Sequence, residues 1–407
     1  MNHLYRILSF ILLLVLNFSF TISVAFSQDT IPKKFGEADD EYTIAFLLPF
    51  NASKVFIRDL QQSDFYLPEE TQIAVEFFQG ALLAIDSLKK MGLKATILVY
   101  DVGNDSATIT SVLARESLEH VDLIIGPLMG YSLKATSSFC RNEHIPLISP
   151  LFASYSDTAS NEFFVLANAT MRTHCERIYD YLLQHELLHR VIMFYRKNAG
   201  DSELVKYIKD YMDQQTAMKS PEVKIVEIQD SSKAAFGTLL DSLFIIDKNV
   251  VVVPSNDESF VRSVIKRLAN FSEDHNIEVI GMPTWLNFDL IPAENFDSTK
   301  TIITSSYWLD KSSASAERFK VLYTGKYKEN PTEYSVYGFD EFFYFGAHLM
   351  ELGNKKFLSA FPPSIGSMIA TNFRVIPVMK EERDVMYLEN KSVFFLQHQN
   401  GKWNKIE

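Results

Sequence analysis

The sequence has only two cysteines among 407 residues, Cys140 and Cys175, so a fold held together by many disulfides is excluded. Both cysteines fall in predicted helices, on opposite sides of the expected domain crossing, and we therefore expect two free, buried thiols. Positive charge is outweighed by negative charge, with 39 Lys and Arg against 51 Asp and Glu, so the formal net charge is −12 and the pI is about 5.3. Without a basic stripe, nucleic acid and anionic membrane surfaces are poor partners.

The common enzyme motifs are also missing. No G-x-S-x-G, G-x-x-x-x-G-K or G-x-G-x-x-G occurs, so neither a serine hydrolase nor a phosphate-cradling loop is indicated. The adjacent acids Asp340 and Glu341 are expected on a solvated face. No catalytic residue, cofactor or metal ligand is assigned, and the protein is predicted not to be an enzyme.

One catalytic motif does occur. His185-Glu186-x-x-His189 matches H-E-x-x-H, which places two histidines and a general base around zinc. Its position argues against that role, because the motif ends a predicted helix and runs directly into the strand Val191 to Tyr195. His189 and Arg190 also suit a helix C-terminus electrostatically. A zinc hydrolase remains the remote alternative.

The N-terminus is typical of an exported protein. Arg6 precedes an apolar run, and Ala25 and Ser27 are small residues near a cleavage site before Gln28, so residues 1–27 are predicted as a signal peptide. A membrane anchor is the alternative interpretation. Residues 28–41 are polar and are expected to form a flexible leader. No cysteine lies near the cleavage site, so a lipid anchor is not indicated. We expect a periplasmic or secreted protein with no membrane insertion after cleavage.

The stretch Val121 to Pro150 predicts the architecture. Val121 to Ile125 is a short apolar run that Gly126-Pro127 closes, as in a strand buried on both faces. A helix over Leu133 to Asn142 and a second buried strand over Ile145 to Ile148 complete a βαβ unit. Parallel sheets of this kind bind ligands beyond the carboxyl ends of their strands.

Two successive β-α series predict two doubly wound α/β lobes. The first series begins at Tyr42, and the second follows Phe163 to Leu166. Helices are expected again at Ala316 to Lys328 and Ser335 to Leu352. We assign residues 42–166 and about 330–362 to lobe 1, and residues 167–329 and about 363–407 to lobe 2, with crossings near Leu166 and between Tyr307 and Asn330.

Four segments resemble the type I periplasmic binding proteins of the branched-chain amino-acid receptor group. They are Ile44 to Pro49, Phe78 to Asp86, Asp122 to Pro127 with Ile145 to Pro150, and Tyr334 to Asp340. The resemblance implies two Rossmann-like lobes with a ligand cleft between them. The opening segments also resemble, more distantly, the envelope lipoproteins that activate penicillin-binding proteins.

The resemblance implies an exported solute-binding protein that serves ABC-type uptake through a membrane permease, or sensing. The alternative is a cell-envelope interaction protein that regulates cell-wall synthesis with the same fold. The turn after the third strand carries Gly130 where the receptors offer a serine to the ligand carboxylate, which does not favour a free amino acid. The expected ligand is small and polar with little charge. The expected contacts, all at carboxyl ends of predicted strands, are Tyr131, Ser132, Ser149, Ser154, Asn198, Asn256 and Tyr307.

Overall fold

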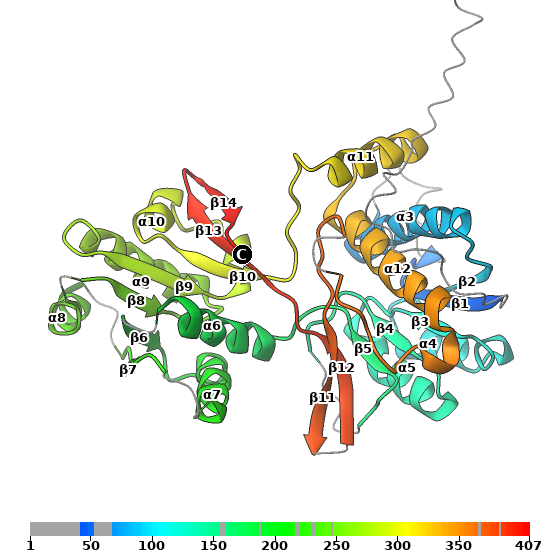
Figure 1. The fold of residues 1–407 in the computed structure, drawn as a ribbon, viewed down its shortest axis with the longest axis horizontal. Coiled ribbons are helices and arrows are strands. Elements are labelled where there is room, and N and C mark those ends of the chain that lie inside the picture. The colour runs from blue at the N-terminus through cyan, green and yellow to red at the C-terminus, as the bar shows by residue number, and fades with distance from the viewer. Residues whose placement is uncertain are drawn as a thin grey trace, which may run out of the picture. The chain divides into compact units, whose positions relative to one another are not determined.

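The computed structural model describes residues 41–52, 67–154, 160–186, 189–215, 220–229, 233–245, 247–364, 368–381 and 384–407. Within these ranges the chain forms two lobes, each built on one seven-stranded sheet flanked by helices (Figure 1). The predicted fold class, two doubly wound α/β lobes, is confirmed. The predicted signal peptide lies outside the described residues.

The lobe 1 sheet has the strand order β11-β12-β5-β4-β3-β1-β2. Its neighbouring strands run parallel except at one edge, where β11 is antiparallel to β12. The strands are β1 (Tyr42–Leu48), β2 (Ala95–Asp101), β3 (Leu123–Ile125), β4 (Leu147–Ser149), β5 (Phe164–Leu166), β11 (Val375–Glu381) and β12 (Asp384–Asn390). The helices are α3 (Glu69–Lys90), α4 (Ser106–Leu113), α5 (Gly130–Glu143), α11 (Ala314–Tyr327) and α12 (Glu333–Leu352), with short 3-10 turns η2 (Glu116–Leu118) and η4 (Asn354–Lys356).

Alternating side chains of β1 reach both helical layers of this lobe. Ala45 and Leu47 pack in one core cluster with Cys140 of α5. Phe46 points the other way and stacks on Phe342 of α12, with ring centroids 5.6 Å apart. The period of two in a strand therefore produces a core on each face of the sheet.

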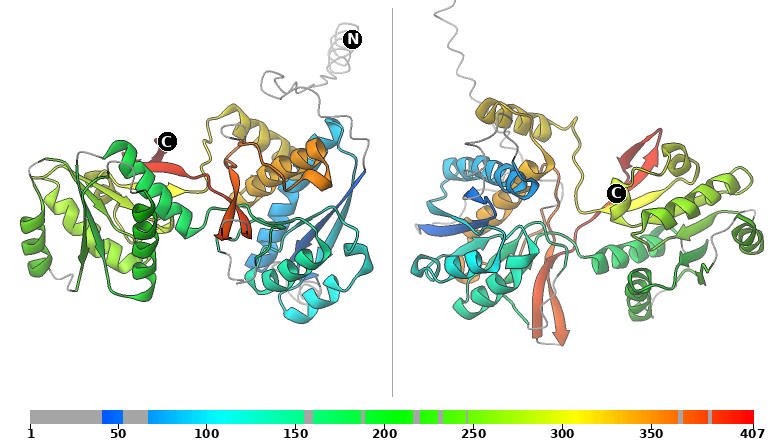
Figure 2. Two further views of the ribbon diagram at one scale, coloured as in Figure 1. Left: turned by 60° about the horizontal axis from the view of Figure 1, so that its bottom comes forward. Right: turned by 180° about the vertical axis from the view of Figure 1, so that it is seen from behind.

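Helices α3 and α12 lie side by side, as Figures 1 and 2 both show. Two glycines allow this close approach. A Cβ built on Gly338 would lie 1.9 Å from the Phe77 carbonyl oxygen, and one on Gly80 would lie 1.8 Å from the Ser335 carbonyl oxygen. Neither position has room for a side chain, so the helix pair depends on both glycines.

The lobe boundaries differ from the expected ones in two places. Helix α11 packs on lobe 1, where Phe319 and Tyr323 share a cluster with Leu83 of α3 and Val336 of α12. Strand β12 pairs with β5 through Leu388 and Val165, so β11 and β12 also belong to lobe 1. The assignment of α11, β11 and β12 to lobe 2 was therefore wrong, because an amphipathic pattern does not specify which core covers its apolar side.

The lobe 2 sheet has the order β14-β13-β10-β9-β8-β6-β7. Strands β6 to β10 are parallel, and β13 and β14 add an antiparallel edge. The strands are β6 (Arg190–Tyr195), β7 (Val223–Glu227), β8 (Asn249–Val252), β9 (Ile277–Gly281), β10 (Ile302–Ser305), β13 (Phe394–Gln399) and β14 (Lys402–Lys405). The helices are α6 (Met171–His185), α7 (Ala199–Gln214), α8 (Lys233–Leu243), α9 (Glu258–Phe271) and α10 (Ala293–Ser298), with the 3-10 turn η3 (Pro283–Asn287).

Three segments join the two sheets, at 167–170, 306–313 and 391–393. The expected lobe assignment placed the third near residue 363, which was wrong because β11 and β12 belong to lobe 1. Glu389, which is 0% exposed, ties the first to the third: its carboxylate accepts a bond of 2.8 Å from the Thr170 backbone N–H and lies 2.9 Å from the Lys391 ammonium. A buried carboxylate with both a cation and an N–H donor is well satisfied, so this junction is firmly held.

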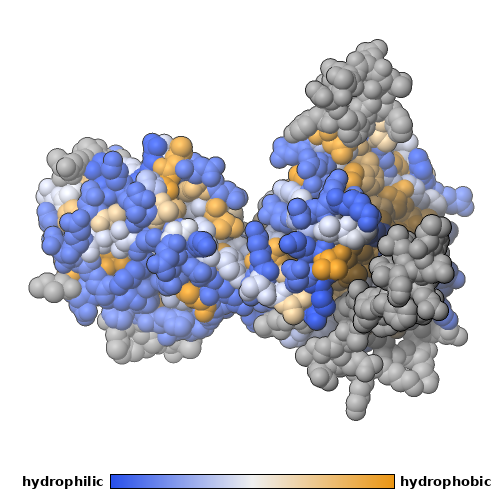
Figure 3. All heavy atoms as spheres, turned by 90° about the horizontal axis from the view of Figure 1, so that it is seen from above, coloured by the Kyte–Doolittle hydropathy of each residue, from blue (hydrophilic) through white to orange (hydrophobic). Residues whose placement is uncertain are grey.

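Cys140 and Cys175 are both free and buried, as expected, and burial raises the pKa of each thiol. In the part of the chain that the structure describes, no helix is long and apolar enough to span a bilayer. On the face drawn in Figure 3, polar residues cover most of the coloured surface and apolar residues show in patches between them.

Candidate functional site

In lobe 1, Asp101 organises the turns that follow β1 and β2. Its Oδ1 accepts bonds of 3.0 Å from the backbone N–H groups of Asn51 and Gly103, and its Oδ2 accepts one of 2.9 Å from Ala52. Three charge-assisted bonds to backbone donors hold the carboxyl ends of two neighbouring strands together. The sheet edge where a ligand is expected is therefore fixed locally.

Tyr131 extends this arrangement to the turn after β3. It lies in the first turn of α5, is 41% exposed, and donates its hydroxyl to the Gly103 carbonyl. Partial burial, with a smaller effect of nearby carboxylates such as Glu70, raises the pKa of Tyr131 to about 12. The side chain thus presents a neutral, anchored ring at the edge of lobe 1.

Ser132 and Ser149 do not lie on the surface, because both are 0% exposed. The Ser132 hydroxyl donates to the Met129 carbonyl at 3.1 Å, within its own helix turn. The Ser149 hydroxyl, at the end of β4, has no hydrogen-bond partner among the described residues. The predicted set of lobe 1 hydroxyls therefore divides into exposed and buried members.

Phe152 and Ser154 form the turn after β4. Ser154 is exposed, and residues 155–159 beyond it lie outside the described part. The Phe152 ring lies against the start of α5, since a Cβ built on Gly130 would be 3.1 Å from Phe152 Cε1. An aromatic ring therefore covers the turn where the resemblance suggested a contact with a ligand carboxylate.

The lobe 2 edge presents amides. Asn198 and Asn256 follow β6 and β8, and both are exposed. The Asn198 side chain caps α7 by accepting a 2.8 Å bond from the Asp201 N–H, and the Asn256 side chain accepts one of 2.8 Å from the Thr284 hydroxyl. Each amide still has its NH₂ group available, because only the oxygen takes part in these bonds.

A charged residue that the sequence analysis did not select lies on the same edge. The Arg196 guanidinium lies 3.3 Å from Asp257 and 3.4 Å from Asp201, and it stacks over Phe260 at 4.4 Å from the ring centroid. Arg196 follows β6 directly, so the rule that selected Asn198 applied to it too. Its positive charge is more than balanced by these two carboxylates, so Arg196 does not make this edge cationic.

Tyr307 belongs to the second crossing segment and is half-buried. Its ring packs on Tyr337 of α12, with centroids 4.7 Å apart, and burial raises its pKa. The Tyr307 ring therefore packs on α12, while its backbone N–H and C=O both bond to the Ser305 hydroxyl at the end of β10. Asn198 and Asn256 bond within lobe 2.

Apolar side chains also reach the surface after β9. Leu286 is 39% exposed and Leu290 is 57% exposed, whereas Trp285, which directly precedes Leu286, is fully buried. The Leu290 N–H bonds to Glu258 Oε1 at 2.6 Å, which ties this loop to the start of α9. The loop adds an apolar surface beside Asn256 that strand-end reasoning did not reveal.

His185, Glu186 and His189 of the H-E-x-x-H motif each pair with a charged side chain of the chain. His185 Nε2 lies 3.5 Å from Glu407, and Glu186, only 2% exposed, accepts a 2.7 Å bond from Lys248. His189 Nδ1 is 2.8 Å from the other oxygen of Glu186. Among the described residues, no group of three or more His, Cys, Asp or Glu side chains is placed to hold a metal ion.

The acids Asp340 and Glu341 were expected on a solvated face, and this was wrong. Asp340 is 0% exposed and Glu341 is 1% exposed. The Asp340 carboxylate accepts bonds from the N–H groups of Ile369, Ala370 and Thr371 at 2.8 to 3.0 Å. Burial raises the pKa of Asp340 to about 7, although these three bonds act against that rise.

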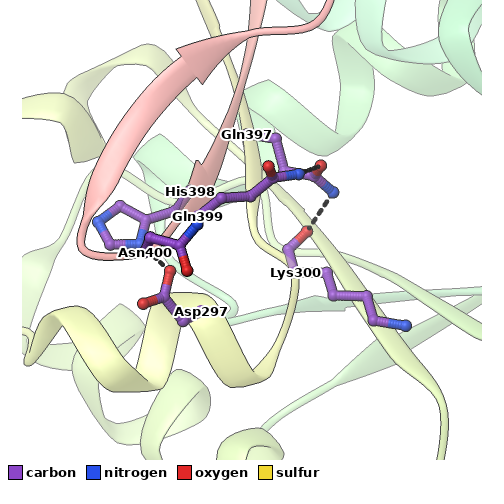
Figure 4. A pocket seen from close by; sticks show the side chains of 6 residues that line it. All are labelled: Asp297, Lys300, Gln397, His398, Gln399 and Asn400. Atoms are coloured by element: carbon purple, nitrogen blue, oxygen red, sulfur yellow. Dashed lines mark hydrogen bonds and ion pairs between the residues drawn. The ribbon is translucent and has the colours of Figure 1, made fainter.

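A pocket of about 430 Å³ lies on lobe 2. Figure 4 shows the residues that line it, which are Asp297, Lys300, Gln397, His398, Gln399 and Asn400. His398 Nδ1 lies 2.8 Å from Asp297 Oδ1, and Asp297 Oδ2 accepts a 3.0 Å bond from the Gly401 N–H. Together these contacts fix the turn between β13 and β14. The His398–Asp297 pair therefore has a structural role in holding this turn.

Comparison with known proteins gives a consistent result for the fold. A family model described as periplasmic binding protein matches residues 72–360. A structure described as a branched-chain amino acid ABC transporter from Rhodospirillum rubrum is similar with a TM-score of 0.64 at 12% identity, covering 90% of this chain and 100% of that one. The ABC transporter substrate-binding protein from Desulfitobacterium hafniense, in complex with Leu, gives a TM-score of 0.54 at 12% identity and covers 90% and 100%.

A third similar structure is the C-domain of LpoA from Haemophilus influenzae, a regulator of PBP1A, with a TM-score of 0.58 at 10% identity and coverage of 90% and 100%. Curated proteins give no match. At such low identity the structural similarities establish the fold, and the same fold carries different functions.

Proposed function

Because the chain belongs to the type I periplasmic binding protein family, we propose that it is an exported, non-catalytic binding protein that captures a small polar ligand between its two lobes. The ligand is bound at the carboxyl edges of the two sheets. The proposed contacts are Tyr131 and Ser154 of lobe 1, Asn198 and Asn256 of lobe 2, and Tyr307 of the second crossing. Ser132 and Ser149, which are fully buried, shape the turns behind this surface.

One observation carries the proposal. Tyr131 and Asn256, from different lobes, both follow parallel strands at the carboxyl ends where such sheets bind ligands, and both are exposed while anchored by a bond to a neighbouring turn. Anchored polar groups bind with little loss of side-chain entropy. A phenol and an amide without a free charge favour an uncharged polar ligand.

The position of Phe152 supports the same ligand class. Its ring covers Gly130 at the first turn of α5, so the helix N-terminus is shielded by an apolar group. A carboxylate bound there would lose hydration against an aromatic ring without gaining a cation. The proposed ligand therefore differs from a free amino acid, and it serves uptake through a membrane permease or sensing.

A thermal-shift screen of the purified protein tests this function. The panel contains amino acids, short peptides, sugars and cell-wall fragments, and a ligand present at a hundred times its Kd should stabilise the fold by about 2.7 kcal/mol. Tyr131→Ala and Asn256→Ala should each weaken binding, while Lys209→Ala, an exposed change on α7, should not. A screen without any stabilising compound would count against the proposal.

A second function is supported by a different observation. Leu286 and Leu290 expose an apolar surface after β9, and exposed apolar patches often mark protein contacts. A cell-envelope interaction protein would use that surface rather than a small-molecule site. Crosslinking in the envelope through a photoreactive residue at position 290 would capture a discrete partner in this case, and Leu290→Asp would abolish the adduct.

A further inference from the structure

A second pocket, of about 490 Å³, lies beside the second crossing segment. Its size is in the range of small-molecule sites, which are commonly 300–1,000 Å³. It is bounded by the crossing itself, by the segment 368–372, and by the adjacent ends of β13 and β14. The lining residues are Trp308, Asp310, Ser313, Ser315, Met368, Ile369, Ala370, Thr371, Asn372, Phe394, Asn404 and Lys405.

One wall of this pocket is held by hydrogen bonds. The Trp308 N–H donates to the Ala370 carbonyl at 2.9 Å, which joins the crossing to the segment 368–372. Asp340 binds the N–H groups of Ile369, Ala370 and Thr371 from the opposite side. A wall fixed in this way can receive a ligand without first being ordered.

Aromatic rings and unused donors line the same space. Phe394 is 5% exposed, and Trp308 is partly buried. The Lys405 ammonium lies 4.9 Å from the Phe394 ring centroid and forms no ion pair with a described residue. The Trp308 indole N–H likewise donates to no described acceptor. Two donors beside flat apolar rings suit a ligand that combines an apolar face with oxygen atoms at its rim.

Acceptors are present at the rim of the pocket. The exposed Asp310 carboxylate is held in place by Ser312, whose N–H and hydroxyl donate to its Oδ1 at 2.9 and 2.6 Å. The Asn404 side chain is oriented by a 3.0 Å bond from its NH₂ group to the Lys402 carbonyl. The pocket therefore offers both donors and acceptors around an aromatic platform.

We propose that this pocket binds a sugar unit, at a site separate from the strand edges that carry the proposed function. The carbon-bound hydrogens of a pyranose face pack on an aromatic ring, and its hydroxyls both donate and accept. Lys405 and Trp308 would donate to ring or hydroxyl oxygens, and Asp310 would accept from a hydroxyl. A nucleotide suits the site less well, because a single lysine beside an aspartate does not neutralise phosphates.

The test uses the purified full-length protein and isothermal titration with two probes, N-acetylglucosamine and glucuronic acid. The first tests a neutral sugar, and the second tests one whose carboxylate would pair with Lys405. Trp308→Ala should weaken binding about tenfold or more, and Lys405→Ala several-fold, since the loss of one contact of about 1.4 kcal/mol is tenfold in Kd. Lys402→Ala, an exposed change in the same strand outside the pocket, should leave Kd unchanged and serves as the matched control.

The outcomes separate this site from the one at the strand edges. Tyr131→Ala and Asn256→Ala should not alter sugar binding at the pocket, whatever they do to the proposed function. The proposal is overturned if neither sugar binds, or if binding persists unchanged in Trp308→Ala and Lys405→Ala. Lys405 is exposed, so its variant reports on the site even if Trp308→Ala fails to fold. Equal binding of leucine, lost in both variants, would refute the assignment to sugars.

Discussion

Replacing Asp340 tests how the fold supports its second crossing. This side chain is 0% exposed, and its two oxygens divide three backbone donors between them. Oδ1 accepts from Ile369 at 2.9 Å, and Oδ2 accepts from Ala370 at 2.8 Å and Thr371 at 3.0 Å. The same segment accepts the Trp308 N–H, so losing Asp340 would loosen the crossing as well.

The expected magnitude follows from counting acceptors. In Asp340→Asn the amide keeps one acceptor oxygen, so at least one buried N–H loses its partner, at a cost of about 1–3 kcal/mol. In Asp340→Ala all three donors lose their partner and a cavity forms, and we expect roughly 3–5 kcal/mol. Asp86→Asn, which breaks only an exposed ion pair with Lys326, should cost less than about 1 kcal/mol.

The pH dependence has a definite sign. Burial raises the pKa of Asp340 to about 7 in the folded state, above the 3.8 of a free carboxyl. Between these two pH values Asp340 is protonated in the folded state and ionised in the unfolded state. The contribution of this group to the free energy of unfolding therefore falls as the pH rises from about 4 to 7. The difference in stability between the wild type and Asp340→Asn should shrink over that interval and become constant above it.

Urea unfolding followed by circular dichroism, extrapolated to zero denaturant at pH 4, 5.5, 7 and 8, measures these quantities. The order expected at pH 8 is Asp340→Ala least stable, then Asp340→Asn, then the wild type with Asp86→Asn close to it. Variants of Asp340 that match the wild type within about 0.5 kcal/mol at every pH would refute the argument, because surface substitutions have effects of that size.

Three further predictions concern other parts of the chain. Gly338→Ala would force a Cβ to within 1.9 Å of the Phe77 carbonyl oxygen and should lower the free energy of unfolding by more than about 3 kcal/mol. The control Gly325→Ala in α11 places a Cβ with nothing within 4 Å and should raise the free energy of unfolding by up to about 1 kcal/mol. Equal urea midpoints for the two variants would contradict this. Cys140 and Cys175 are free and buried, so neither should react with a thiol reagent in the native protein, and both should react in urea. A reaction in the native protein, or fewer than two reactive thiols in urea, would show that they are not two free, buried thiols. Tyr131→Phe removes the bond to the Gly103 carbonyl and should cost about 1 kcal/mol in urea unfolding, unlike Tyr334→Phe, and no difference between the two would argue against that anchor.

The sequence predicted the fold where burial alone determines the pattern. Strand β3, Leu123–Ile125, is buried between neighbouring strands, so its apolar composition identifies it without knowledge of its partners. Strand β12, by contrast, was missed, because Asp384 and Glu389 interrupt its apolar pattern. Glu389 is buried there only because Thr170 and Lys391 supply partners from distant segments. Such pairing across the chain is not visible in local composition.

The candidate site was predictable to the level of the sheet edge. Tyr131, Asn198 and Asn256 follow strands and are exposed or partly exposed, but Ser132 and Ser149, selected by the same rule, are buried. Position after a strand specifies the edge, whereas the direction of each side chain depends on how the turn folds. Asp101, which holds these turns together, was missed for a related reason, because two of its three donors lie some fifty residues earlier in the chain.

The central claim, that the two sheet edges hold a small ligand, is tested most directly by native mass spectrometry of the protein recovered from the cell envelope. The proposed function predicts one small molecule per chain, released on denaturation and absent from a Tyr131→Ala, Asn256→Ala double variant that folds normally. A wild-type mass equal to that of the bare chain under gentle conditions, and unchanged after incubation with every class in the ligand panel, would contradict it.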